Sequence, residues 1–268
     1  MNQYVHGYSE RESKRLEEQS EILEKLLHEG TRYKPYEHIL EAGCGVGAQT
    51  VILAKRNPEC FITSIDISNL SIKTAKNKVT AEGINNVTFQ QADILNLPFE
   101  QNKFDHIFVC FVLEHLSNPS DALNNLKKVL KPGGTITVIE GDHEACIWNP
   151  TSHASQKTWR AMIKSQQMLG HDPNIGRRLY PLLFNAGFNV EFTEPRWIYT
   201  DGNQPNLANG MVNKIIVPMT KTAQDYALKH NLIDEETWKQ GIIDLENSSK
   251  TPEGTFFYTW FKALGKKQ

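Results

Sequence analysis

The chain has 268 residues, of which 39% are hydrophobic and 22% charged, a composition typical of globular proteins. No apolar run reaches the roughly 18 residues needed to cross a bilayer, which argues against a membrane span. The formal net charge of −2 lacks the basic excess that non-specific nucleic-acid binding needs, so we expect no nucleic-acid partner.

The first residues and the cysteines both predict a cytoplasmic location. The start of the chain has no apolar segment followed by a small-residue cleavage site, so no secretory signal is expected. Cys44, Cys60, Cys110 and Cys146 are widely spaced and form no C-x-x-C pair. This spacing argues against a disulfide framework, and we expect no metal site.

An amphipathic pattern predicts a first helix over residues 9–29. Ser9 and Glu12 have the spacing of a capping box at its start. The preceding aromatic segment, YVHGY at 4–8, has two interpretations: its rings cover the helix or the core, or the arm folds over a ligand.

From residue 38 short apolar strands alternate with helices. The predicted strands cover 38–42, 60–66, 87–92, 104–110 and 135–141, and the predicted helices 47–56, 69–82 and 119–130, the last ending in a KPGG turn. Such alternation predicts a parallel sheet with helices on both faces and a ligand site at the carboxyl ends of its strands.

After residue 145 the pattern is mostly helical. It predicts helices over 151–169 and 177–186, a strand over 189–199, helical segments up to 249 and a last strand over 254–265. We expect a single domain, 1–268. Its expected parts are an N-terminal helical arm (1–30), a cofactor-binding core (31–145), a helical lid or acceptor region (146–187 and 200–252) and closing strands (188–199 and 253–265).

The segment EAGCGVG at 41–47 joins the first strand to its helix. Three alternate glycines, Gly43, Gly45 and Gly47, allow a ligand to approach the backbone and permit positive φ angles. Gly43, Gly45 and Ala48 also match the G-x-G-x-x-G/A pattern of dinucleotide-binding folds. The turn alone therefore leaves two classes of cofactor open.

Acidic residues stand at the ends of the predicted strands: Glu41, Asp66, Asp93, and Glu140 with Asp142. A single aspartate after a strand is often a helix cap, but four such positions in one sheet favour a polar ligand. Asp66 follows Gly47 by nineteen residues, where an acidic side chain can accept from ribose hydroxyls. This pattern favours a ligand that contains adenosine.

These motifs, with ADI at 92–94, FVLEHL at 111–116 and KPGGTITVIE at 131–140, resemble those of S-adenosylmethionine-dependent methyltransferases. Among them the chain is most similar in type to small-molecule enzymes of the ubiquinone and menaquinone kind. The resemblance implies a Rossmann-like three-layer α/β/α sandwich with a mostly parallel seven-stranded sheet, an antiparallel final hairpin and helical lid insertions.

The resemblance also implies residue roles around S-adenosylmethionine. Glu41 would act near the cofactor's ammonium group, Asp66 would accept from the ribose hydroxyls, and Asp93 would accept from the adenine amino group. The full set expected around the cofactor is Tyr8, Glu41, Gly43, Cys44, Gly45, Gly47, Gln49, Thr50, Asp66, Ile67, Ala92, Asp93, Ile94 and Phe111.

The acceptor is expected near residues 140–148, which leave the fifth strand. His143 is the candidate general base, with Asp142 either orienting it or contacting the acceptor. An Asp-His pair in a loop is more often a cap or a surface hydrogen bond. The side chains expected to line the acceptor pocket are Tyr4, His115, Glu140, Trp148, Arg177 and Tyr199.

The sequence therefore predicts an enzyme that transfers the methyl group of S-adenosylmethionine to a small molecule by in-line displacement. Two alternatives stay open: an oxidoreductase that uses a nicotinamide cofactor, and a non-catalytic protein that binds S-adenosylmethionine.

Overall fold

The alternating apolar runs form a mostly parallel sheet in the computed structural model, which describes residues 10–268. Its first strands match their predicted ranges to within one residue: β1 (His38–Ala42), β2 (Phe61–Asp66), β3 (Val87–Gln91) and β4 (Phe104–Cys110). They pair in parallel in the order β3-β2-β1-β4. Because the strand order reverses between β1 and β4, the expected ligand crevice lies beyond their carboxyl ends.

The described chain divides into two compact units. The first, which we call the sheet unit, comprises Glu24–Gly141, Ile175–Pro195 and Trp260–Gln268. The second, the helical unit, comprises 10–23, Asp142–Asn174 and Arg196–Thr259. Helix α1 (Glu10–His28), predicted over 9–29, contributes residues to both.

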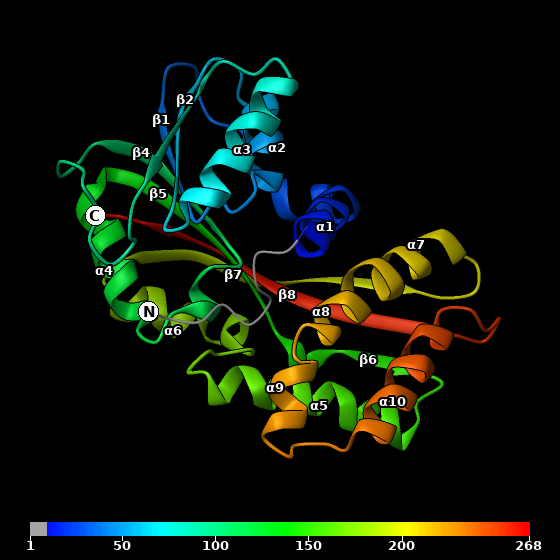
Figure 1. Cartoon of the computed structure of the whole chain (residues 1–268). Helices are drawn as coiled ribbons and strands as arrows, with labels where there is room; N and C mark the ends of the chain where they lie inside the picture. The colour runs from blue at the N-terminus through cyan, green and yellow to red at the C-terminus, as the bar shows by residue number, and fades with distance from the viewer. Residues whose placement is uncertain (1–9) are drawn as a thin grey trace. The chain divides into compact units, whose positions relative to one another are not determined.

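In the sheet unit the predicted helices cover the sheet. Helices α2 (Ala48–Arg56) and α3 (Asn69–Ala81) lie side by side next to β1 and β2 (Figure 1). Helices α4 (Pro119–Val129) and α6 (Leu179–Asn185) pack into the main core cluster with Ile107 and Val109 of β4. Phe108, between them in sequence, stacks on His28 instead. This alternation shows that both faces of β4 are covered.

Strand β5 (Leu130–Gly141) begins earlier than the predicted strand at 135. The KPGG segment, predicted as a turn, is part of it, but the pairing with β4 jumps from Phe104↔Leu130 to His106↔Thr135. The residues between form a bulge in which Gly133 takes a φ of 78°. The glycines mark a break in register rather than the end of a turn.

The sheet formed by residues 10–268 has eight strands, one more than predicted. The extra strand is β6 (Ile147–Asn149), which is three residues long. Strand β8 (Thr255–Lys266) runs antiparallel to both β5 and β6 and lies between them, and β7 (Asn189–Thr200) also pairs with β8. The mostly parallel sheet with an antiparallel end was correctly predicted.

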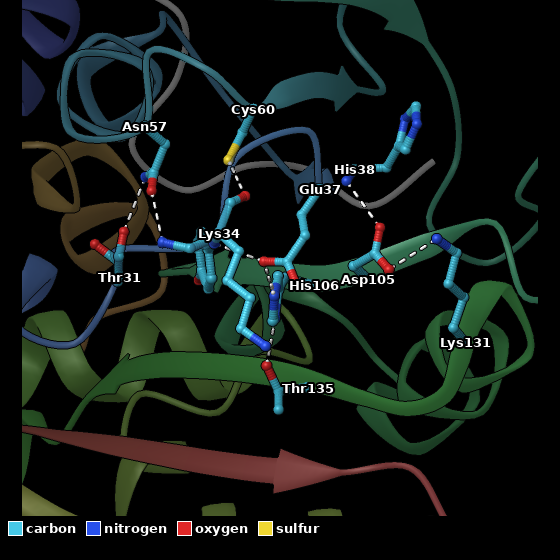
Figure 2. A network of polar contacts seen from close by, with 11 residues as sticks. Thr31, Lys34, Glu37, His38, Asn57, Cys60, Asp105, His106, Lys131 and Thr135 are labelled. Carbon is cyan, nitrogen blue, oxygen red and sulfur yellow. Dashed lines mark hydrogen bonds and ion pairs between the residues drawn. The ribbon is translucent and has the colours of Figure 1, made fainter.

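A polar network holds the amino ends of the strands (Figure 2). The glycine turn follows the carboxyl end of β1, at the other end of the strands. His106 on β4 lies between Glu37, 3.0 Å from its Nε2, and Thr135, 2.7 Å from its Nδ1. The backbone N–H of His38 donates to Asp105, which also pairs with Lys131 at 2.7 Å. These contacts tie the segment before β1 to β4 and β5, so the start of β1 is fixed independently of its ligand-side end.

The helical unit contains seven further helical segments: η2 (His143–Ala145), α5 (His153–Met168), α7 (Pro205–Asn209), a π-helix (Gly210–Ile216), α8 (Val217–Lys221), α9 (Gln224–Lys229) and α10 (Glu235–Ser248). Helices α5 and α10 pack so closely that a Cβ at Gly241 would lie only 2.1 Å from the Thr158 hydroxyl. The π-helix ends just before Pro218, whose missing N–H and ring disfavour regular α-helical bonding to Lys214. No helix among residues 10–268 is both long and apolar enough to span a membrane.

Candidate functional site

The three glycines of the turn after β1 all have positive φ, but each for a different spatial reason. A Cβ on Gly43 would lie 2.4 Å from the Val112 side chain, and one on Gly47 would lie 2.9 Å from the backbone of Ala75 on α3. A Cβ on Gly45 would meet nothing within 4 Å. Gly43 and Gly47 therefore allow the protein to pack on itself, whereas Gly45 borders open space.

Glu41 lies at the carboxyl end of β1 and is only 2% exposed. Its Oε2 accepts from the hydroxyls of Thr50 at 2.7 Å and Ser64 at 2.6 Å. Its Oε1 is also buried but has no hydrogen-bond partner among residues 10–268. Burial raises the pKa of Glu41 to about 7, against the opposing effect of the two hydroxyls. A buried oxygen without a partner is a ready acceptor for a ligand.

Asp66 ends β2 beside the same turn. Its Oδ2 accepts from the Gly45 N–H at 2.9 Å and its Oδ1 from the Ser68 N–H at 2.8 Å. Burial raises the pKa of Asp66, while these backbone N–H groups oppose the rise. The carboxylate thus joins the two turns that follow β1 and β2, and each oxygen has a further lone pair for a ligand.

The segment after β3 brings the remaining predicted adenine contacts to the same edge. The Ala92 N–H donates to the Asp66 carbonyl at 3.0 Å, so the two strand ends are joined directly. Asp93 is exposed and accepts from the Leu95 N–H, while Ile94 is buried. Ile67 is 61% exposed, which is unusual for an isoleucine next to a buried strand. An apolar ligand surface over Ile67 would remove it from water.

Cys44, Gln49 and Thr50 are occupied by contacts within the protein. Gln49 Oε1 lies 2.7 Å from Nε2 of His28, and Thr50 donates to Glu41. Cys44 is buried, and burial raises the pKa of its thiol far above its ordinary value. These three residues shape the turn, and His28 is a neighbour that the sequence pattern did not indicate.

Phe111 and the short 3-10 helix η1 (Leu113–His115) follow β4 and are held by Glu140 at the end of β5. Glu140 is fully buried and accepts from the N–H groups of Val112 at 3.0 Å, Leu113 at 2.7 Å and Glu114 at 3.4 Å. Phe111 takes a φ of 56° to begin this turn. Since Val112 packs over Gly43, Glu140 fixes one wall of the glycine turn.

Replacing Glu140 with glutamine is expected to loosen this wall without removing much volume. The amide oxygen can keep two of the three N–H donors, but its NH₂ group cannot accept from Glu114, which leaves a buried donor unpaired at a cost of about 1–3 kcal/mol. Amide hydrogen exchange should speed up at residues 112–114, with Glu144→Gln on the exposed side of η2 as the control. Unchanged protection at 112–114 would contradict the role given to Glu140.

Asp142, His143 and Trp148 are all buried and belong to the helical unit. The His143 Nδ1 lies 2.5 Å from the Tyr258 hydroxyl, and its backbone carbonyl accepts from the Trp159 indole N–H at 2.9 Å. Burial, with a smaller contribution from Arg15, lowers the pKa of His143 to about 3. His143 is therefore neutral at pH 7, and Tyr258 is a partner that lies 115 positions away in sequence.

The buried histidines predict a loss of stability in mild acid. Burial lowers the pKa of His28 to about 4 and that of His143 to about 3, while an unfolded histidine titrates near 6.5. Between these values the unfolded state binds more protons, so each histidine contributes stability above pH 6.5 that is lost as the pH falls, by about 1.4 kcal/mol per pH unit. The free energy of unfolding, measured with urea at several pH values from 7 to 5, should fall less steeply with pH for His143→Phe than for wild type. An equal dependence on pH in the two proteins would refute the assignment.

The other predicted acceptor residues are scattered. His115 lies 3.3 Å from Glu114 and is partly buried, whereas Arg177 in the sheet unit and Tyr199 in the helical unit are exposed. Tyr4 and Tyr8 lie outside the described residues. The structure thus brings together Glu41, Gly45, Thr50, Asp66 and Ala92 around the turn.

The family model that matches this chain and two of its relatives are described as methyltransferases. The family model described as a methyltransferase domain matches residues 34–187. An uncharacterized methyltransferase of Schizosaccharomyces pombe is 31% identical over 248 residues, which cover 88% of this chain and 86% of that protein. A demethylmenaquinone methyltransferase of Listeria monocytogenes is 30% identical over 104 residues, but the match spans only 38% of this chain and 44% of the relative.

A solved structure shows the same fold. Phosphoethanolamine N-methyltransferase 2 of Haemonchus contortus, in complex with phosphomonomethylethanolamine and S-adenosylhomocysteine, superposes with a TM-score of 0.56 over 93% of this chain and 52% of that one. The two sequences are 15% identical, so this likeness concerns the fold.

Proposed function

The chain belongs to the S-adenosylmethionine-dependent methyltransferases, and on that premise we propose that it methylates a small-molecule acceptor by in-line displacement. The observation that carries the proposal is the open space at Gly45, whose N–H donates to Asp66, with the buried, partnerless Oε1 of Glu41 at the end of the strand that leads into the same turn. These groups fit a ligand with hydroxyls and a positive charge. The protein from Haemonchus contortus binds a small acceptor, which supports the acceptor class.

We propose that the residues at this end of the sheet each contact a different part of the cofactor. Asp66 would accept from the ribose hydroxyls, Glu41 from the ammonium group, and Asp93 from the adenine amino group, with the exposed Ile67 and the buried Ile94 against the adenine ring. When bound, the cofactor supplies a methyl group on a positive sulfur that is already activated. The chain must then align the acceptor behind that methyl group and exclude water, and alignment alone can contribute about 7–11 kcal/mol.

His143 and Asp142 remain candidates for acid-base chemistry. A histidine whose pKa lies near 3 is neutral at pH 7 but accepts a proton weakly, because the catalytic optimum lies near the working pH. We therefore propose that methyl transfer depends mainly on orientation, as for an amine acceptor that needs no base. Segments 146–187 and 200–252 would form the lid and acceptor region.

The nicotinamide-dependent alternative finds no support, because the family model and the relative from Schizosaccharomyces pombe are both methyltransferases. The non-catalytic alternative is tested by activity. We also propose a cytoplasmic location, since the four cysteines are all free, which fits a reducing compartment.

Incubation with methyl-labelled S-adenosylmethionine and a fractionated metabolite extract, followed by mass detection, tests activity and acceptor class together. We expect one small labelled product and matching release of S-adenosylhomocysteine, and neither with Asp66→Ala. Calorimetry that shows no S-adenosylmethionine binding to the wild type would overturn the proposal. Label found only in protein or nucleic acid would overturn the acceptor class.

A further inference from the structure

Glu41 has an unusual set of partners for a buried carboxyl group. Both donors to its Oε2, Thr50 and Ser64, are neutral hydroxyls, and its Oε1 has no donor among residues 10–268. No lysine, arginine or histidine of the described chain forms an ion pair with it. A fully buried carboxylate with this few donors is strongly disfavoured relative to the neutral acid.

The titratable groups around Glu41 add to this effect. Asp66 from β2 acts on Glu41 as a like charge, and the thiols of Cys44 in the turn and Cys110 on β4 lie near enough to be affected by the charge of Glu41. Burial raises the pKa of both thiols well above the ordinary value, so neither carries charge at pH 7. Of the main effects on Glu41, only the hydrogen bonds from Ser64 and Thr50 favour ionisation, and burial raises its pKa to about 7.

We propose that Glu41 is a specificity residue that carries a proton in the ligand-free protein and releases it when a ligand brings a cationic group to the glycine turn. The inference rests on the proposed function, since the cationic group is the ammonium of the methionine moiety. The proton passes to the buffer, and the carboxylate left behind is compensated by the ligand's positive charge. A nucleoside without that charge would leave the proton in place.

Two adenosine ligands separate these cases. S-adenosylhomocysteine carries the ammonium group, whereas 5′-methylthioadenosine has the same nucleoside and a thioether but lacks the amino-acid part. Because ionisation of Glu41 accompanies only the first, the affinity for S-adenosylhomocysteine should fall about tenfold per pH unit well below pH 7. The affinity for methylthioadenosine should stay nearly constant over the same range.

The direct test is calorimetry at pH 6.5 in buffers of low and high ionisation enthalpy, such as phosphate and Tris-type amines. The slope of the observed enthalpy against buffer enthalpy gives the number of protons released. We expect a release of about half to one proton for S-adenosylhomocysteine and almost none for methylthioadenosine, as follows from a group titrating near pH 7. The wild-type comparison needs no variant and so does not depend on a substituted protein folding.

Glu41→Gln keeps the size and both hydroxyl contacts but cannot titrate. It should abolish the proton difference between the two ligands, weaken S-adenosylhomocysteine about tenfold and leave methylthioadenosine within about threefold. Glu37→Gln, at the other end of β1, is the control and should keep the wild-type difference. Equal proton release for both ligands in the wild type would overturn the role given to Glu41 but not the proposed function. No binding of S-adenosylhomocysteine would overturn the proposed function and, with it, this inference.

Discussion

Replacing Asp66 with alanine should weaken S-adenosylhomocysteine binding by about 100-fold or more. The carboxylate organises the site through the Gly45 and Ser68 N–H groups and, in the proposed complex, accepts from two ribose hydroxyls. Hydrogen bonds to a charged group contribute about 1.5–3 kcal/mol each, so the loss of two removes about 3 kcal/mol or more. Isothermal titration calorimetry at one pH measures the change.

The matched control is Asp93→Ala, which removes an exposed carboxylate whose described contact is a local bond to the Leu95 N–H. Its effect should be about tenfold or less, because an exposed partner is replaced by water. Thermal unfolding of both variants separates loss of fold from loss of binding. An Asp66→Ala protein that is folded and binds within threefold of wild type would refute the assignment of Asp66 to the ribose.

The gathering of Glu41 and Asp66 beside the glycine turn was predictable because it depends on strand ends. In a parallel sheet the carboxyl ends of neighbouring strands meet at one edge, so Glu41 and Asp66 had to lie near the glycine turn once β1 and β2 were identified. The direct bond from Gly45 to Asp66 agrees with that reasoning. The sequence also indicated open space at the turn, but it did not distinguish Gly45 from Gly43 and Gly47.

The role of Glu140 could not be predicted from the sequence. Its position at the end of β5 suggested the acceptor pocket, yet it accepts from the backbone of Val112, Leu113 and Glu114. These contacts depend on the left-handed φ of Phe111, a conformation rare for a bulky residue and without a sequence signal. The pairing of His143 with Tyr258 was equally hidden, since nothing local links positions 115 residues apart.

Local propensity also failed where tertiary contacts decide structure. Strand β6 has only three residues and exists by pairing with Phe256 and its neighbours on β8, so no alternation was long enough to predict it. The KPGG segment carries turn residues, but pairing at both of its ends keeps it inside β5 as a bulge. In each case the partner strand, not the segment itself, determines the conformation.

Alanine substitutions in the glycine turn should separate ligand binding from folding. Gly45→Ala places a Cβ into open space, so its stability cost is limited to the strain of φ 51°, about 1–2 kcal/mol. In the proposed complex that Cβ would occupy the space in which the cofactor approaches the backbone. The affinity for S-adenosylhomocysteine should then fall by about 100-fold or more, which corresponds to about 3 kcal/mol of binding free energy. Denaturation and calorimetry on the same protein give both quantities.

Gly47→Ala should behave in the opposite way. Its Cβ would lie 2.9 Å from both Cα and Cβ of Ala75, so α2 and α3 must move apart, and φ is 81°. Overpacking and backbone strain together should cost about 3 kcal/mol or more of stability. The double variant Gly47→Ala with Ala75→Gly removes one of the two clashing atoms and should recover part of that loss. If Gly45→Ala proved the less stable protein and still bound S-adenosylhomocysteine normally, the open space at Gly45 would not be the cofactor site.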